Sequence, residues 1–207
     1  MAEDIFNIEF KKTNIQLDGA INEEEWKNSS IINKLKSPWN IYKNDNTEFR
    51  CFFSDKFFNF SFKVFDNELK YSREFDKKDV VKGDRVELFF GPNLTLKEYY
   101  CLEISPQGII YDYRANYYRI FDDTWSFRGC EVVSQISREG YIVEGKISII
   151  ELEMLYIDIC KGFYMGVYRA DCKVIGKSFN WFTWKDPKTD VPDFHIPETF
   201  QYCKLKK

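Results

Sequence analysis

The chain contains 207 residues, of which 44% are hydrophobic and 30% charged, and its formal net charge is −3. That is enough to bury a core in one β-sandwich domain over residues 1–207, since sandwiches of roughly 200 residues are routine. The 30 Lys and Arg residues are scattered among 33 Asp and Glu without a basic stripe, which argues against nucleic acid as a partner. No segment approaches the roughly 18 consecutive apolar residues that a membrane-spanning helix needs, so membrane insertion is not expected.

Aromatic residues make up 18% of the chain, and they favour strands because they fit a pleated, half-buried surface. The six cysteines include no CxxC pair, so neither a zinc site nor a disulfide scaffold is indicated and buried free thiols are expected. Residues 1–10 lack the basic start and apolar core of a signal peptide. This leaves open a cytoplasmic protein and an exported one from which the signal has been removed.

The first predicted elements lie near the N-terminus. Ile15–Leu17 leads into a turn at Asp18-Gly19. Asn22 is then expected to cap a short helix through Trp26, because the acidic residues that follow it suit the N-terminal end of a helix.

From Phe57 onward the pattern predicts strands joined by turns. In Phe57–Asp66, apolar residues alternate with polar ones at the period of a half-buried strand. Turns at Pro106-Gln107-Gly108 and Arg138-Glu139-Gly140 predict two hairpins. The other predicted strands are Asp84–Phe90, Tyr99–Ser105, Ile109–Ala115, Gly129–Ser137, Tyr141–Ile149 and Phe163–Cys172, and Ile150–Tyr156 suggests a second helix. This density of strands indicates an all-β fold, a two-sheet antiparallel sandwich of jelly-roll type with one or two short helices.

Catalytic motifs are scarce. His195 is the only histidine and lies between two prolines in Pro192–Pro197, which favours a structural role over that of a base. There is no nucleophile elbow and no glycine-rich phosphate loop. Glu87, Glu103 and Glu144 lie on predicted strands, and paired carboxylates can serve a glycosidase, but nothing singles out an acid and a base. No catalytic residue is assigned, and the chain is not expected to be an enzyme.

A binding role has more support. If the predicted strands are neighbours in one sheet, their charged side chains share one face, namely those of Arg85, Glu87, Glu103, Asp112, Arg114 and Arg169. Carboxylates and guanidinium groups can each hold two sugar hydroxyls, and the apolar face of a sugar ring stacks on an aromatic ring. The chain offers Trp39, Trp125, Trp181 and Trp184 in polar, loop-like surroundings, where binding residues concentrate. The alternative, in which the charges form a solvated face or internal ion pairs and the tryptophans cover the core, stays open at this point.

Six short motifs follow one another along nearly the whole chain. They are Ile15-Gln16-Leu17-Asp18-Gly19 with Trp26, Gly83–Phe90, Tyr99–Gly108, Gly140-Tyr141 through Glu144 and Ile147, Tyr168-Arg169-Ala170, and Trp184–Pro187 with Pro192–Phe200. In this order they resemble the family 9 carbohydrate-binding modules, specifically the family-9-like proteins of Bacteroidetes. The chain departs from the family at Gln201, where a glycine usually follows the final phenylalanine.

The resemblance implies a β-sandwich that binds the end of a sugar chain in a cleft. Two tryptophans would clamp the sugar, and charged side chains would hold its hydroxyls. Trp184 falls on the late tryptophan, and Trp39 is taken as its partner. The resemblance is also compatible with a structural calcium ion, although no cofactor is required and no metal ligand is assigned.

The sequence therefore predicts a non-catalytic bacterial protein whose partner is a glycan or oligosaccharide. The predicted ligand-binding residues are Trp39, Arg85, Glu87, Glu103, Arg114, Trp125, Arg169 and Trp184. One alternative is a glycan-active hydrolase that uses two of the carboxylates. Another is a module of the same fold with a filled cleft, which binds a protein through an exposed aromatic patch.

Overall fold

The structure, a computed structural model, describes residues 4–40, 44–74 and 76–206. The smaller of its two sheets contains β2 (Ser30–Ile32), β5 (Glu48–Phe53), β6 (Phe57–Phe65), β11 (Cys130–Ile136) and β12 (Gly140–Ser148). They follow the order β11-β12-β6-β5-β2. Every pairing in this sheet is antiparallel in the part of the chain described.

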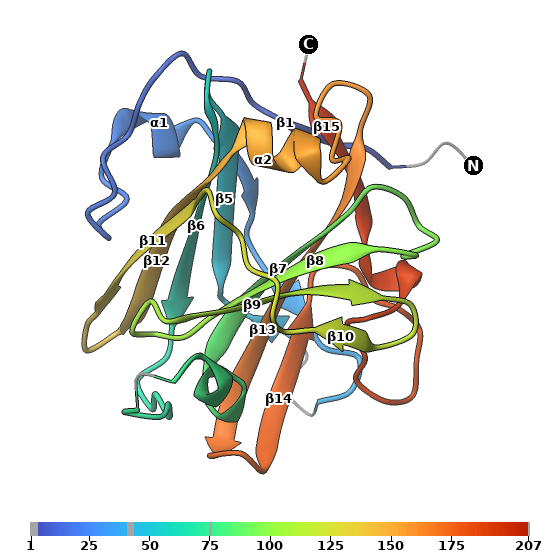
Figure 1. Cartoon of the computed structure of the whole chain (residues 1–207). Helices are drawn as coiled ribbons and strands as arrows, with labels where there is room; N and C mark the ends of the chain where they lie inside the picture. The colour runs from blue at the N-terminus through green and yellow to red at the C-terminus, as the bar shows by residue number, and fades with distance from the viewer. Residues whose placement is uncertain (1–3, 41–43, 75, 207) are drawn as a thin grey trace.

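The larger sheet contains β1 (Phe6–Ile8), β3 (Leu35–Lys36), β4 (Asn44–Asp45), β7 (Arg85–Gly91), β8 (Tyr99–Ile104), β9 (Ile110–Asn116), β10 (Ile120–Asp122), β13 (Phe163–Val174), β14 (Ser178–Thr183) and β15 (Gln201–Leu205). Its main path is β10-β9-β8-β7-β13-β14-β3-β4, and β15 pairs with both β13 and β1. Figure 1 shows the two sheets as separate layers with both termini at the same end. Short helices complete the fold: α1 (Glu24–Lys27), α2 (Ile149–Met154) and the 3-10 helices η1 (Lys77–Lys82) and η2 (Pro197–Thr199).

The predicted all-β sandwich is confirmed, and each predicted strand occurs with its ends shifted by no more than two residues. One pair departs from the antiparallel pattern and one expectation is wrong. The pair β1–β15 is parallel, since the two ends of the chain meet across the sheet edge rather than through a hairpin. Asn22 does not cap α1: Glu23 takes the N-cap position in extended conformation, and it makes no side-chain capping hydrogen bond.

The core lies between the two sheets. Its residues follow from the alternation of side chains along each strand, in which every second residue points to the same face. Phe58, Phe60 and Phe62 of β6 are fully buried and face Val86, Leu88 and Phe90 of β7 in one apolar cluster. Four of the six cysteines, at positions 51, 101, 172 and 203, are buried free thiols as predicted, whereas Cys160 is exposed. No helix in the described residues is long and apolar enough to cross a membrane.

Strands β7 and β8 differ from an ordinary half-exposed strand because every residue in them is buried. Their inner face packs on the core. On their outer face lies a second apolar cluster that includes Phe89, Tyr99, Tyr168, Phe194 and Phe200. The segment 192–200 covers this outer face and leaves Arg85, Glu87 and Glu103 beneath it.

The register of the larger sheet corrects the predicted shared face. Glu87 lies opposite Glu103, so both are on the outer face. Arg169 lies opposite Val86, and Arg114 lies opposite Tyr100, which places both arginines on the inner face. Asp112, opposite Leu102, is also on the inner face. The prediction of one charged face is therefore wrong. Side chains alternate between the two faces along each strand, and the register between neighbouring strands decides which charged residues share a face.

Glu144 on β12 ties the N-terminal segment to the smaller sheet. Its side chain is fully buried and accepts hydrogen bonds from the backbone N–H of Asp18 and Gly19, both at 2.9 Å, and from Nε1 of Trp26 at 3.1 Å. Burial raises the pKa of Glu144, and these hydrogen bonds act against that rise. The Asp-Gly motif and the tryptophan are thus parts of one structural anchor.

We predict that Glu144→Gln lowers the free energy of unfolding by roughly 2–3 kcal/mol, because an amide offers one acceptor oxygen where three donors converge. Denaturant unfolding measures the change. Glu153→Gln, at an exposed position of α2, is the matched control and should be neutral. Equal stability of the two variants would contradict the role of Glu144.

Candidate functional site

A pocket of about 200 Å³ opens on the outer face of the larger sheet. It is lined by Arg85, Glu87, Glu103, Arg119, Trp181, Pro192, Asp193, Phe194 and His195. A larger open groove of about 660 Å³ lies on the other sheet, between residues 14–17 and Lys146. We take the smaller pocket as the candidate site, since buried polar groups and an aromatic ring converge there, as they do in small-molecule sites.

The floor of the pocket is a row of side chains across three strands. Trp181 of β14 lies opposite Ala170 of β13, and Ala170 lies opposite Arg85 of β7. Because the alanine between them is small, the guanidinium reaches the indole, with its central carbon 5.3 Å from the ring centroid. This is within the range of a cation–π contact. The row thus holds the guanidinium of Arg85 over the ring of Trp181.

Two glutamates flank the guanidinium. The Nε of Arg85 donates a hydrogen bond to Oε2 of Glu103 at 2.7 Å, and Oε1 of Glu87 lies 2.9 Å from the same nitrogen. The hydroxyl of Tyr113 donates to Oε1 of Glu103 at 2.9 Å. Burial and the neighbouring Glu103 carboxylate raise the pKa of Glu87 to about 8.

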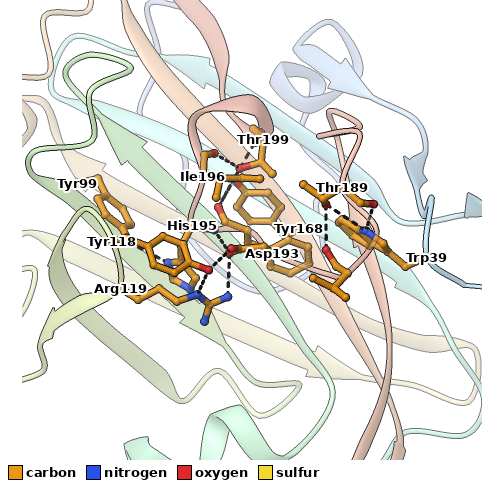
Figure 2. Close-up of polar contacts among 12 residues, drawn as sticks. Trp39, Tyr99, Tyr118, Arg119, Tyr168, Thr189, Asp193, His195, Ile196 and Thr199 are labelled. Atoms are coloured by element: carbon orange, nitrogen blue, oxygen red, sulfur yellow. Dashed lines mark hydrogen bonds and ion pairs between the residues drawn. The ribbon is translucent and has the colours of Figure 1, made fainter.

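The wall of the pocket comes from the segment 192–200. Phe194 stacks on Tyr168 of the sheet at a centroid distance of 4.3 Å, and the Tyr168 hydroxyl lies 2.8 Å from Oγ1 of Thr199. Thr199 in turn donates to the backbone carbonyl of Phe194 at 2.8 Å. Figure 2 shows Tyr168 beside this segment, with Thr199 at one end and Asp193 at the other. These contacts hold the wall on the sheet.

Asp193 joins the wall to the turn between β9 and β10. Its carboxylate accepts a hydrogen bond from Nη2 of Arg119 at 2.8 Å and another from the hydroxyl of Tyr118. Figure 2 shows both side chains converging on it. Although burial opposes ionisation, the hydrogen bonds from Tyr118 and from the backbone N–H of His195, together with Arg119, lower the pKa of Asp193. Asp193 is thus held as the anionic partner of Arg119.

His195 lies in the pocket wall as a neutral group. Its Nδ1 is 3.0 Å from the hydroxyl of Tyr99, and the residue is buried. Burial, with a further contribution from Arg119, lowers the pKa of His195 to about 3. A neutral imidazole offers one donor and one acceptor nitrogen. The pocket as a whole presents forked donors, carboxylate acceptors and an aromatic ring, which suits a ligand rich in hydroxyl groups.

Of the predicted ligand-binding residues, the structure brings Arg85, Glu87 and Glu103 into this pocket. Trp39 lies next to it: its ring contacts Phe194 at 6.2 Å, and its Nε1 donates to the carbonyl of Thr189 at 2.9 Å.

The other four predicted residues lie elsewhere. Trp125 packs on Tyr100 and Phe127 beside the core, and Trp184 packs edge-on against Phe6 at 4.8 Å. Arg114 is partly exposed and pairs with Asp122 at 2.8 Å. Arg169 is buried in ion pairs on the inner face.

Sequence reasoning did not assign Trp181, Arg119, Asp193 or His195 to the ligand. For Trp181 a signal was present, because β14 alternates and places this residue on the same face as Phe179 and opposite Asn180 and Phe182. Arg119 carried no such signal, since only the turn after β9 brings it to Asp193.

A calcium ion fits poorly at the one acidic cluster found among the described residues. The carboxylates of Asp66, Asp84 and Asp171 lie within 4.8 Å of one another. However, the guanidinium of Arg169 reaches Asp66 at 2.6 Å and Asp45 at 2.5 Å, and Asp84 already accepts the backbone N–H of Cys172 at 2.8 Å. Burial raises the pKa of Asp84 to about 6. The arginine thus supplies the positive charge there, and a divalent cation would be repelled by it.

The comparisons with known proteins agree with this architecture. The profile of the family described as carbohydrate family 9 binding domain-like matches residues 17–207. A Bacteroides uniformis protein, proposed to bind carbohydrate, shares the fold with a TM-score of 0.78 at 14% identity, over 99% of this chain and 100% of that one. A search of curated proteins gives no significant match.

A family 9 carbohydrate-binding module of Caldicellulosiruptor kristjanssonii is also similar in structure. Its complex with cellotriose has a TM-score of 0.64 at 16% identity, over 98% of this chain and 94% of that one. A family 9 module of the same organism in complex with glucose has a TM-score of 0.57 at 20% identity, over 97% and 95% of the two chains. At these identities the likeness shows a shared fold.

We predict that His195 makes the protein sensitive to acid. Because its folded pKa lies below the unfolded value of 6.5, its contribution to stability is complete above pH 6.5 and is lost as the pH falls toward 3. Relative to His195→Gln, the wild type should lose roughly 2–3 kcal/mol more unfolding free energy between pH 7.5 and 4.5. Denaturant unfolding at the two pH values measures this. Parallel losses in both proteins would contradict a neutral, buried histidine.

We also predict that EDTA leaves the melting temperature unchanged, because Arg169 takes the place of a cation at the acidic cluster. Arg169→Met should lower the free energy of unfolding by roughly 3–5 kcal/mol, since it leaves buried carboxylates without a partner. Thermal unfolding with EDTA, and again after calcium is added back, tests both statements. A melting temperature that falls with EDTA and recovers with calcium would show that a metal is needed.

Proposed function

The chain belongs to the family of carbohydrate family 9 binding domain-like proteins, and we propose that it binds the end of an uncharged glycan without cleaving it. The proposed site is the pocket that Trp181, Arg85 and His195 line. The observation that carries the proposal is the row Trp181–Ala170–Arg85, which holds a guanidinium over an aromatic ring at the floor of the pocket.

The size of the pocket supports an end of a chain as the ligand. Sites for drug-sized molecules have volumes of roughly 300–1,000 Å³. At about 200 Å³, this pocket is smaller and suits one sugar ring. The segment 192–200 closes one side, so the remainder of a glycan would leave through the open side.

The charges favour an uncharged sugar. Arg85 is paired with Glu103, and Arg119 is paired with Asp193. Each arginine in the lining therefore has a carboxylate partner, and no unpaired cation remains among the described lining residues to attract an acidic sugar. With the charges paired in this way, we propose that the donor and acceptor atoms of the lining hold the hydroxyl groups of an uncharged sugar.

The structural neighbours suggest which sugars to try first. Modules of the same fold were solved with cellotriose and with glucose. We therefore propose glucose-ended chains as the first probes for this protein.

A hydrolase is the second candidate, and one observation favours it. Glu87, with a raised pKa, lies beside the Glu103 carboxylate in a pocket, as an acid and its partner do in glycosidases. One feature opposes it. Both oxygens of Glu103 already accept hydrogen bonds, from Arg85 and Tyr113.

We predict that Trp181→Ala weakens binding of cellotriose by about tenfold or more, equivalent to about 1.4 kcal/mol, because the aromatic surface of the pocket is lost. A glycan-array screen followed by calorimetric titration measures the change. Trp184→Ala is the matched control: it removes the same side chain from the groove beside Phe6.

Loss of binding in Trp181→Ala alone supports the pocket. Loss in Trp184→Ala alone would move the site to the tryptophan that the sequence motif indicated. Chromatography of the recovered cellotriose completes the test, since release of glucose by the wild type would favour the hydrolase instead. A folded protein that binds no glycan on the array would overturn the proposed function.

A further inference from the structure

Glu87 and Glu103 share a single N–H group. The two residues lie directly opposite each other on β7 and β8, and both carboxylates contact Nε of Arg85. This nitrogen carries one hydrogen, which it donates to Glu103. Both side chains are almost fully buried, with 2% and 6% of their surface exposed. Two buried carboxylates therefore compete for one donor.

The contacts divide the two glutamates into unequal partners. Glu103 has a donor for each oxygen, Arg85 for one and Tyr113 for the other. In contrast, Oε1 of Glu87 is buried and has no hydrogen-bond partner among the residues that the structure describes. A buried anionic oxygen without a donor is costly, whereas a neutral carboxylic acid can donate a hydrogen bond of its own. The geometry thus makes Glu103 the anion and leaves Glu87 to be neutral.

The charged and titratable groups around Glu87 agree with this division. Glu87 faces Arg85 of its own strand, Glu103 of β8, and Arg119 of the turn after β9. Across β13 it lies opposite Tyr168, and the wall of the pocket adds Asp193 and the neutral His195. Arg85 is paired with Glu103 and Arg119 with Asp193. No cation among these groups is left to balance an ionised Glu87.

We propose that Glu87 carries a proton in the free protein at neutral pH and uses it to donate a hydrogen bond to an acceptor oxygen of the bound sugar. This inference rests on the proposed function for its ligand, but the proton itself does not depend on any ligand. With Glu87 neutral, the charges of the lining cancel. If Glu87 were ionised, it could only accept hydrogen bonds, and the net charge of the pocket lining would be negative.

The proposal predicts a loss of affinity at alkaline pH. Since the pKa of Glu87 is raised to about 8 by burial and by Glu103, the proton is lost mainly between pH 7 and 9. If binding requires the proton, the Kd for cellotriose should rise about tenfold over this interval. In Glu87→Gln, which has no titrating proton at this position, the Kd should change less than about twofold over the same interval, whatever its value at pH 7.

Two measurements on the free protein test the proton separately. An infrared difference spectrum of wild type minus Glu87→Gln at pH 6.5 should show the carbonyl band of a protonated, buried carboxyl group. Wild type minus Glu153→Gln, with an exposed glutamate exchanged, should show an ionised carboxylate instead.

The second measurement is the stability of the free protein against pH. A raised folded pKa means that the contribution of Glu87 is complete below its unfolded value of 4.5 and is lost as the pH rises through 8. Glu87→Gln should remove this decline, and Glu153→Gln should keep it.

The outcomes separate the two proposals. A protonated carboxyl band with an alkaline loss of affinity supports both. The band without binding of glucose or cellotriose at any pH supports the protonated Glu87 and overturns the proposed function. Absence of the band from wild type, or an alkaline loss of affinity that persists in Glu87→Gln, overturns the inference while leaving sugar binding intact.

Discussion

Burial of both faces of β7 and β8 is the constraint from which the rest of the site follows. A strand in a sandwich usually packs one face on the core and leaves the other in water. Here the segment 192–200 covers the second face, so Arg85, Glu87 and Glu103 lose their solvent. Buried charges must pair with one another. The result is a compact group of one guanidinium, that of Arg85, and two carboxyl groups, those of Glu87 and Glu103. This group lines the pocket.

The covering segment is itself fixed by aromatic stacking and by one carboxylate. Phe194 lies flat on Tyr168, and Asp193 holds the turn after β9 through Tyr118 and Arg119. The wall and the rim of the pocket are therefore parts of one hydrogen-bonded unit. A site whose parts support one another in this way is preorganised, which lowers the entropic cost of binding a ligand.

Two buried arginines on neighbouring strands have different roles because they point to opposite faces. Arg169 lies on the inner face, where it forms ion pairs with Asp45 and Asp66. Arg85 lies on the outer face beside Trp181, where its surroundings open into the pocket. The same residue type thus serves stability at one position and, in our proposal, recognition at the other.

The sequence by itself determined the strands, their alternation and the family, because hydrophobic periodicity and ordered motifs are local properties of the chain. It also identified Arg85, Glu87 and Glu103 as members of one polar cluster, which the register of β7 and β8 confirms. Only the tertiary structure decided that Arg169 and Arg114 face the other way, because the offset between neighbouring strands is not written in either strand alone. It also decided that Trp181, and not Trp184, lines the pocket, since that depends on the small Ala170 between Trp181 and Arg85 and on the distant segment 192–200 folding back over the sheet.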